Sequence, residues 1–135
     1  ITRLATAFGS QAVVCAIDTA GGKVFSRAGT HATGRDVVQW AEEAEQRGAG
    51  ELLLTSIATD GTRDGYDVQT TAVVASAVGI PVIASGGAGN AAHIAAALQV
   101  AQAALLASIL HDDPEGLPLL RAELKEMGVE LRDVG

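Results

Sequence analysis

Pro81-Val82-Ile83-Ala84-Ser85-Gly86-Gly87-Ala88-Gly89-Asn90 is the stretch of sequence that decides the fold. A short apolar run after a proline is followed by small residues and glycines, and an alanine-rich helical pattern begins at Ala91. This order predicts a buried strand, then a tight turn, then the start of a helix. Glycine has no Cβ, so a ligand can approach the backbone of this turn closely.

The same turn predicts a phosphate site. The N–H groups of the turn and of the new helix converge on one point, where the helix dipole favours an anion. A glycine-rich turn that binds nothing is the alternative. The spacing matches neither the GxGxxG dinucleotide fingerprint nor the GxxxxGK[ST] phosphate loop.

Apolar runs and helical patterns alternate along the rest of the chain. We expect strands at 13–17, 51–57, 81–84 and 103–107, and helices at 1–8, 35–47, 67–78, 91–100 and 112–127. Thr33 or Gly34 is the expected cap of the second helix, and residues 23–27 can form one arm of a small hairpin.

Four βα units of one sense predict a parallel sheet with right-handed crossovers. The polar residues that we single out for function stand at or just beyond the carboxyl ends of the strands: Asp18, Asp60, Ser85 and Ser108. Folds built from βα units place their chemistry at this edge.

Composition limits the class of protein. The 135 residues fit a single domain, 1–135, and hydrophobic residues make up 48% against 3% aromatic, which indicates an aliphatic core. A net charge of −7 argues against nucleic acid or an anionic membrane as a partner. No membrane span or signal peptide is visible, and Cys15 is alone, so we expect a cytoplasmic protein. The three histidines lack metal-ligand spacing, and we expect neither a metal nor a cofactor.

Taken together, several short segments resemble one known family. The segments are 9–11, 16–18, 47–51, 54–57, 60–67, 84–89 and 107–109, among them Asp60-Gly61-Thr62-Arg63-Asp64-Gly65 and Ala84-Ser85-Gly86-Gly87. In this order and spacing they are similar to the cyclase subunit of imidazole glycerol phosphate synthase, which acts in histidine biosynthesis. The resemblance covers nearly the whole chain.

The resemblance implies a fold and a set of roles. The family is a (β/α)₈ barrel about twice as long as this chain, which resembles its C-terminal half. It implies that Asp18 is one of two catalytic aspartates that assemble an imidazole ring from ammonia and a phosphorylated nucleotide. The family's other catalytic aspartate belongs to its N-terminal half. By the same resemblance Thr55 and Asp60 line the same pocket, and we name Asp60 as a second catalytic candidate. One phosphate grip consists of Ser85, Gly86, Gly87, Ala107 and Ser108. Glu51 matches a charged residue at the opposite mouth, where ammonia enters from a glutaminase subunit.

A half barrel needs a second half. Four parallel strands would expose an aliphatic inner face and two unpaired edges, so we expect a homodimer that completes the barrel. In such a dimer Asp18 would face Asp18 of the other copy. The missing N-terminal half, or a glutaminase subunit, is another possible partner. Two alternatives stay open, namely a structural half barrel without turnover and a flavodoxin-like open sheet.

Overall fold

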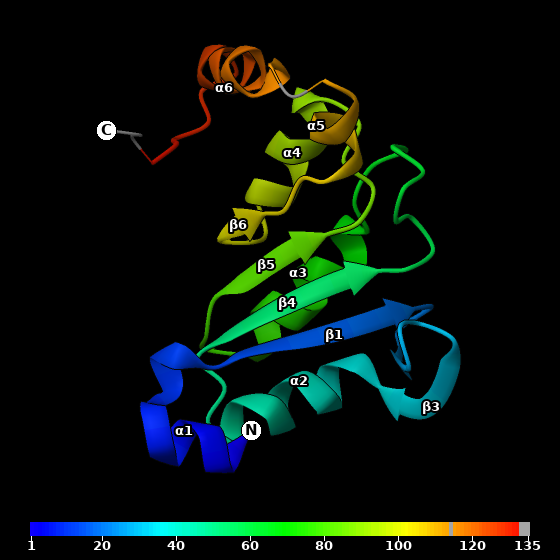
Figure 1. Ribbon diagram of the computed structural model, residues 1–135, viewed down its shortest axis with the longest axis vertical. Coiled ribbons are helices and arrows are strands. Elements are labelled where there is room, and N and C mark those ends of the chain that lie inside the picture. Colours follow the sequence, from blue (N-terminus) through cyan, green and yellow to red (C-terminus); the bar gives the residue numbers. More distant parts are fainter. Residues whose placement is uncertain (114, 133–135) are drawn as a thin grey trace.

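The computed structural model describes residues 1–113 and 115–132, and its centre is one mixed sheet with strand order β3-β2-β1-β4-β5-β6 (Figure 1). Strands β1 (Val14–Ala20), β4 (Glu51–Ser56), β5 (Val82–Ser85) and β6 (Ala103–Ala104) run parallel. Strands β2 (Lys23–Ser26) and β3 (His31–Asp36) form an antiparallel hairpin beside β1. This is the sheet expected of half a (β/α)₈ barrel, with a hairpin added at one edge.

Helices precede, connect and follow the parallel strands. They are α1 (Thr2–Phe8), a 3₁₀ turn η1 (Ser10–Ala12), α2 (Val37–Gln46), α3 (Val68–Ala77), α4 (Ala91–Leu98), α5 (Ser108–Asp112) and α6 (Gly116–Glu126). Each crossover helix begins at a side-chain cap. Asp36 caps α2, Asp67 caps α3 and Asn90 caps α4, each through a side-chain oxygen that accepts an N–H of the first turn.

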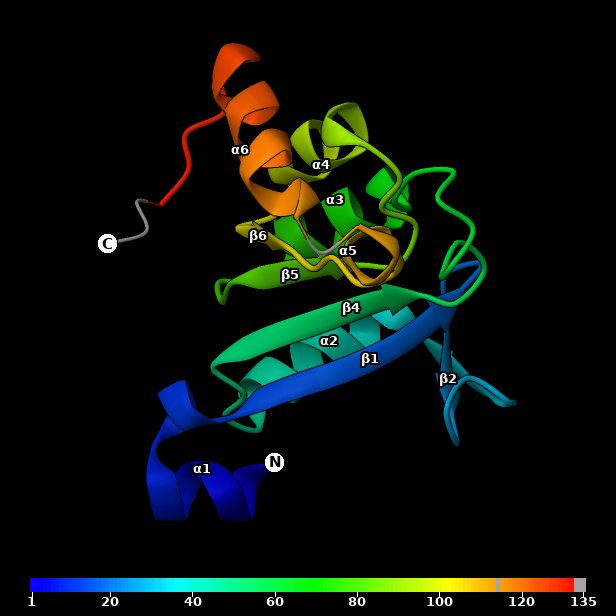
Figure 2. The same cartoon turned by 45° about the horizontal axis from the view of Figure 1, so that its top comes forward.

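The core lies between one face of the sheet and helices α2, α3 and α4. Side chains from alternate positions of the strands, such as Ile17, Leu54 and Val82, form one cluster with Val37 and Ala41 of α2. Farther along the sheet, Ala84 packs against α4 and α6 in a second cluster. Alanine recurs on the helices, so each helix axis can approach the sheet closely. Turning the molecule shows α2 behind β1 and β4, and α3 behind β5 (Figure 2).

No such layer of described residues covers the opposite face of the sheet. Val14 is 51% exposed there, and Ala16, two residues further on, is also exposed. Leu53 and Ile83, which are in register with Ala16, are half-buried. A flavodoxin-like open sheet carries helices on both faces. The one-sided arrangement therefore differs from that alternative and matches a half barrel with its interior side open.

Three predicted boundaries are wrong. The second helix begins at Val37, not Arg35, and its cap is Asp36, because residues 31–36 pair with β2 and Thr33 donates its hydroxyl to the Val24 carbonyl. The strand expected at 103–107 pairs only at 103 and 104, and a short helix takes over at Ser108.

The last helix was expected to open in the acidic segment from 112, but it begins at Gly116. Asp112 instead ends α5, and Pro114 lies outside the described residues. In the part of the chain that the structure describes, no helix has both the length and the apolar character needed to cross a membrane.

Candidate functional site

Three polar side chains form a row across the carboxyl ends of neighbouring strands. Asp18 of β1 is in register with Thr55 of β4, which is in register with Ser85 of β5. Neighbouring strands are roughly 4.8 Å apart, so the row is about 10 Å long. Residues in register on parallel strands share one face, and this row lies on the face that no described helix covers. Ser85 is 8% exposed, whereas Asp18 and Thr55 are half-buried.

A cavity of about 250 Å³ lies beside this row, beyond the ends of β5 and β6. The residues that line it come from three separate loops, and they are Asp60, Gly61, Gly86, Gly87, Ala88, Leu105, Ala107 and Ser108. The structure thus brings together five of the eight predicted site residues. Asp18, Thr55 and Ser85 are not in the lining.

Backbone donors at this cavity lack an acceptor among the described residues. The N–H groups of Gly86, Gly87, Ala88 and Gly89 donate to no acceptor within 1–113 or 115–132. Within the described residues, the first N–H groups of α5 also have no acceptor, as expected at the start of a helix. Leu110 is the first residue of α5 whose N–H donates to the Ala107 carbonyl. An anion of phosphate size would satisfy such donors.

The glycines of the turn also have a packing role. Gly86 and Gly87 have φ of +90° and +103°, which disfavour any side chain. A Cβ on Gly87 would lie 2.0 Å from the Gly65 carbonyl oxygen, and one on Gly89 would lie 2.1 Å from that of Arg63. The loop between β4 and α3 therefore packs directly on the turn. Gly65 N–H donates to the Gly87 carbonyl at 2.8 Å.

Tyr66 anchors this loop to the end of β6. Its hydroxyl donates to the Leu105 carbonyl at 2.9 Å, and the side chain is buried. Burial raises the pKa of Tyr66 to about 12. At neutral pH the phenol therefore stays protonated and keeps donating.

Arg63 is a residue that sequence reasoning missed. Its guanidinium donates to the Ser108 carbonyl at 3.0 Å and forms an ion pair with the Asp112 carboxylate. The contact joins the β4–α3 loop to α5, two segments 45 residues apart in sequence. No local pattern predicted it, since an arginine between glycines in a loop is usually solvated.

Asp18 is also among the residues that line a different cavity, of about 370 Å³, at the edge of β1. Phe25 of the hairpin and Trp40 of α2 supply aromatic walls, and Arg35 lies 4.2 Å from the centre of the Trp40 ring. Glu43 forms ion pairs with Arg35 and with Arg47. Desolvation raises the pKa of Glu43, but the two guanidinium contacts outweigh it, so the pKa lies below its ordinary value.

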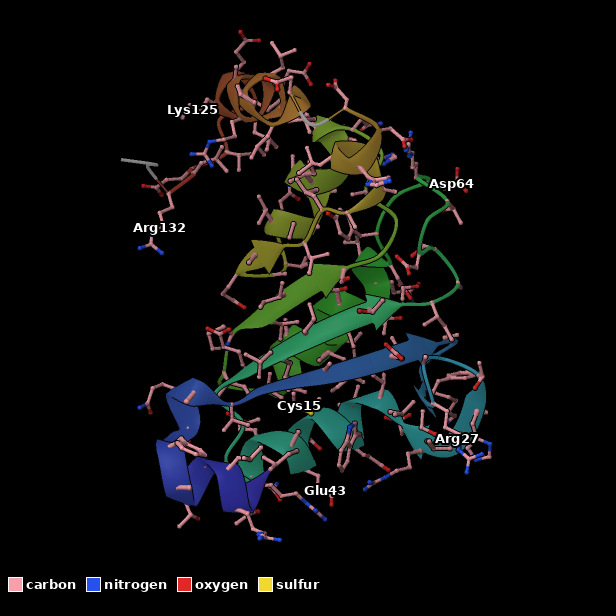
Figure 3. All side chains as sticks on the ribbon, viewed as in Figure 1. Cys15, Arg27, Glu43, Asp64, Lys125 and Arg132 are labelled. Carbon is pink, nitrogen blue, oxygen red and sulfur yellow. The ribbon has the colours of Figure 1, made fainter. Side chains whose placement is uncertain are left out.

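The remaining chemistry-bearing residues are dispersed. Cys15 is half-buried against the core, where burial raises the pKa of its thiol (Figure 3). Glu51 opens β4, at the end of the strand opposite Asp18 and Thr55. Among the residues that the structure describes, no three His, Cys, Asp or Glu side chains group as metal ligands do.

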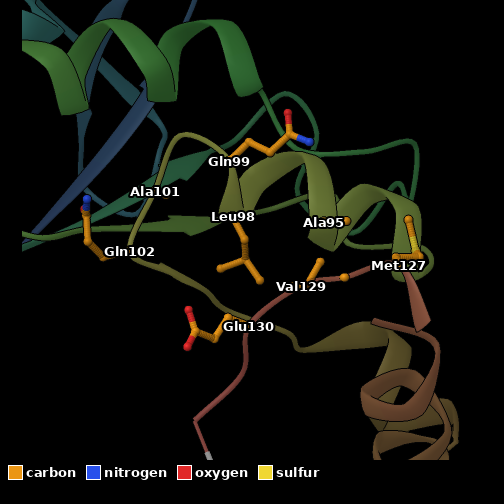
Figure 4. A pocket seen from close by; sticks show the side chains of 9 residues that line it. Ala95, Leu98, Gln99, Ala101, Gln102, Met127, Val129 and Glu130 are labelled. Atoms are coloured by element: carbon orange, nitrogen blue, oxygen red, sulfur yellow. The ribbon is translucent and has the colours of Figure 1, made fainter. Parts of the chain in front are cut away.

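A larger cavity is remote from these residues. It measures about 390 Å³ and lies between α4 and the segment after α6, where Leu98, Met127 and Val129 contribute side chains (Figure 4). None of the predicted site residues lines it. Size alone therefore does not identify the site, and the 250 Å³ cavity remains the candidate.

The fold is half of a βα barrel, and glycine-rich turns and polar residues lie at the carboxyl ends of its strands. These features define the class of protein. The chain belongs to the histidine biosynthesis protein family, whose sequence model matches residues 1–114.

Within that family the chain is similar to imidazole glycerol phosphate synthase subunit HisF. It is 51% identical to HisF of Sulfurisphaera tokodaii over 136 aligned positions, which cover 98% of this chain and 55% of that protein. It is 52% identical to HisF of Acidobacterium capsulatum, with 98% and 54% covered, and 47% identical to HisF of Myxococcus xanthus, with 99% and 55% covered. The chain therefore spans about half the length of the curated relatives it matches.

Proposed function

We propose that the chain is the C-terminal half of an imidazole glycerol phosphate synthase cyclase subunit and that it binds a phosphate group in the 250 Å³ cavity. The observation that carries this proposal is the convergence of three loops on one cavity. Gly86, Gly87 and Ser108 bring N–H groups that have no acceptor among the described residues. A phosphorylated substrate supplies the missing acceptors.

The row of Asp18, Thr55 and Ser85 beside the cavity supplies the side chains that would act on a bound phosphorylated substrate. Asp18 is the proposed catalytic carboxylate, Asp60 the second candidate, and Thr55 and Ser85 position substrate between them. The two carboxylates have unlike surroundings. Asp18 lies beside the aromatic edge cavity, whereas Asp60 lies on an exposed loop at the phosphate cavity.

Catalysis needs the other half of the barrel. The uncovered face exposes Val14 and Ala16, and Leu105 at the far edge is 38% exposed. The hairpin pairs with β1 only from Asp18 to Ala20, so the edge from Val14 to Ile17 can accept another strand. We propose that a second copy of the chain, related by a twofold axis, completes the barrel. The N-terminal half of the family's barrel is the other partner that fits this edge.

A structural half barrel without turnover is the second candidate. The packing of Gly86, Gly87 and Gly89 against the β4–α3 loop favours it, because these glycines would be required even if no ligand bound. The two candidates predict different responses to phosphate and to the missing half.

Titration with inorganic phosphate, followed residue by residue in ¹⁵N–¹H spectra, tests binding. We expect the amide signals of Gly86, Gly87 and Ser108 to shift saturably, and those of remote glycines such as Gly21 to stay in place. Sodium chloride at equal ionic strength is the control. Absence of a saturable shift would reject the phosphate site.

A cyclase assay then separates an enzyme from a structural half. The chain alone is expected to be weakly active or inactive, since positioning errors of about 1 Å can reduce rates ~100-fold. Addition of the N-terminal half of a HisF protein should restore turnover, and Asp18→Asn should abolish it. Complexes that form but never turn over would favour the structural candidate.

A further inference from the structure

Arg63 and Asp112 form an ion pair at the rim of the proposed phosphate cavity. The Arg63 guanidinium also donates to the carbonyl of Ser108, which lines that cavity, so the positive charge lies against the first turn of α5. The N–H groups of Ser108 and Ile109, which have no acceptor among the described residues, belong to the same turn. Figure 2 shows the loop after β4 and helix α5 on the same side of the sheet.

The cavity itself is poor in positive charge. Its lining contains the acidic Asp60 and, among the described residues, neither lysine nor arginine, and the whole chain has a net charge of −7. A phosphate dianion in such surroundings gains from backbone dipoles but is repelled by nearby carboxylates. Arg63 is the cation whose hydrogen bond to a lining residue already places it beside the site.

The backbone of Arg63 is fixed while its side chain can move. Its φ is +63°, and its carbonyl oxygen lies so close to Gly89 that a Cβ there would be 2.1 Å away. The side chain is 41% exposed, and that of Asp112 is 62% exposed. Exposed ion pairs are weak, so a doubly charged anion that offers several acceptors can replace Asp112 as the partner.

We propose that Arg63 is a binding residue of the phosphate site and that Asp112 is its built-in competitor. When the cavity is empty, Asp112 neutralises the guanidinium. When phosphate enters, the guanidinium turns from Asp112 to the anion while its contact with Ser108 keeps it near α5. This inference rests on the phosphate site proposed above, and it adds that phosphate affinity is set by the competition.

Calorimetric titration of the full chain with inorganic phosphate at pH 7 tests the competition. We expect Asp112→Asn to bind phosphate roughly three- to tenfold more tightly and Arg63→Gln to bind roughly tenfold more weakly. The affinity of Arg63→Gln should also depend less on salt, because one exposed charge is removed. In the double variant, adding Asp112→Asn to Arg63→Gln should not change the phosphate affinity, because the guanidinium with which Asp112 pairs is absent.

Arg3→Gln and Glu123→Gln are the matched controls, because each makes the same change in net charge on an exposed helix away from the cavity. They should bind phosphate like the unaltered chain. The inference would be overturned if Asp112→Asn strengthened phosphate binding equally in the presence of Arg63 and in the Arg63→Gln variant. It would also be overturned if Glu123→Gln strengthened phosphate binding. Circular dichroism verifies that each variant is folded.

The outcomes separate this inference from the phosphate site itself. If the unaltered chain binds phosphate and both Arg63→Gln and Asp112→Asn bind equally well, the competition is rejected and the site stands. If only Asp112→Asn binds, the competition is supported, and the unaltered chain is not a phosphate binder. If no variant binds, both are rejected.

Discussion

At Gly87 the backbone leaves no room for a side chain. Gly87→Ala would place a methyl group 2.0 Å from the Gly65 carbonyl oxygen in a conformation that L-residues avoid, so we expect a loss of more than about 3 kcal/mol in unfolding free energy. Urea unfolding followed by the fluorescence of Trp40, the one tryptophan of the chain, measures it.

Gly21→Ala is the matched control for that substitution. Gly21 has φ of +56°, but no described atom lies within 4 Å of the place that the new methyl group would occupy, so only conformational strain is added. We expect roughly 1 kcal/mol there. Equal losses at the two positions would mean that the loop does not press on the turn.

Tyr66→Phe removes a single hydrogen bond to the Leu105 carbonyl from a buried site. The expected cost is about 1 kcal/mol, because the carbonyl loses its donor while the ring still packs. Urea midpoints of the two proteins at pH 7 and at one protein concentration measure the difference.

The same residue predicts a response to alkali. The folded pKa of Tyr66 is raised to about 12, above the value near 10 of an unfolded chain. Its contribution is therefore complete below pH 10 and is lost as the pH rises from about 10 to 12. The difference between the unaltered chain and Tyr66→Phe should shrink over that window, and a constant difference would contradict the assigned burial.

At the scale of elements, the cap of α2 predicts a response to acid. The hydrogen bond from the Gln39 N–H lowers the pKa of Asp36 most. Desolvation opposes it, but the Val38 N–H and Lys23 lower the pKa further, so it lies below its ordinary value. Because the folded pKa is below the unfolded value near 3.9, ionised Asp36 stabilises the folded state at pH values above about 3.9. This stabilisation is lost as the pH falls through the folded pKa.

Asp36→Asn keeps a capping oxygen but cannot ionise. Thermal melts between pH 2 and 6 should show that Asp36→Asn loses less stability on acidification than the unaltered chain does. Asp64→Asn, which removes a charge from the exposed loop at the tip labelled in Figure 3, is the control and should melt like the unaltered chain. Parallel curves for all three proteins would contradict this role of Asp36.

Local patterns predicted the elements better than their ends. The order of the four parallel strands and of the helices between them follows from periodicity, and the half-barrel class followed from the family resemblance. The start of α2 did not, because Thr33 pairs across the hairpin with Val24, a partner nine residues away. The last strand is short because β6 is an edge, with a ladder partner only in β5 among the described residues.

The sequence likewise predicted some residues of the candidate site and missed others. Strand ends pointed to Asp18 and Ser85, the turn pointed to Gly86 and Gly87, and the family resemblance pointed to Thr55. Arg63 could not be found, because its importance depends on Ser108 and Asp112, which reach it only after the sheet has formed. Long-range contacts of exposed charges leave no periodic trace in a sequence.

At the scale of the whole molecule, the uncovered sheet face predicts self-association. Val14→Lys would place an ammonium group inside the completed barrel, so we expect association at least about 100-fold weaker. Val73→Lys is the control, because Val73 is 53% exposed on α3, outside the barrel, against 51% for Val14. Sedimentation velocity over a range of concentrations measures both. A monomer at every concentration of the unaltered chain would reject the homodimer, and equal dissociation by both variants would mean that another face associates.

The hairpin beside β1 has a consequence for any chain that joins there. It occupies the last three residues of that strand and leaves the first four open. An incoming strand can slide along the free length only until it meets the ribbon, which acts as a mechanical stop and fixes the alignment of the two halves. Shortening the ribbon would remove that stop, and the assembly would then choose among several offsets.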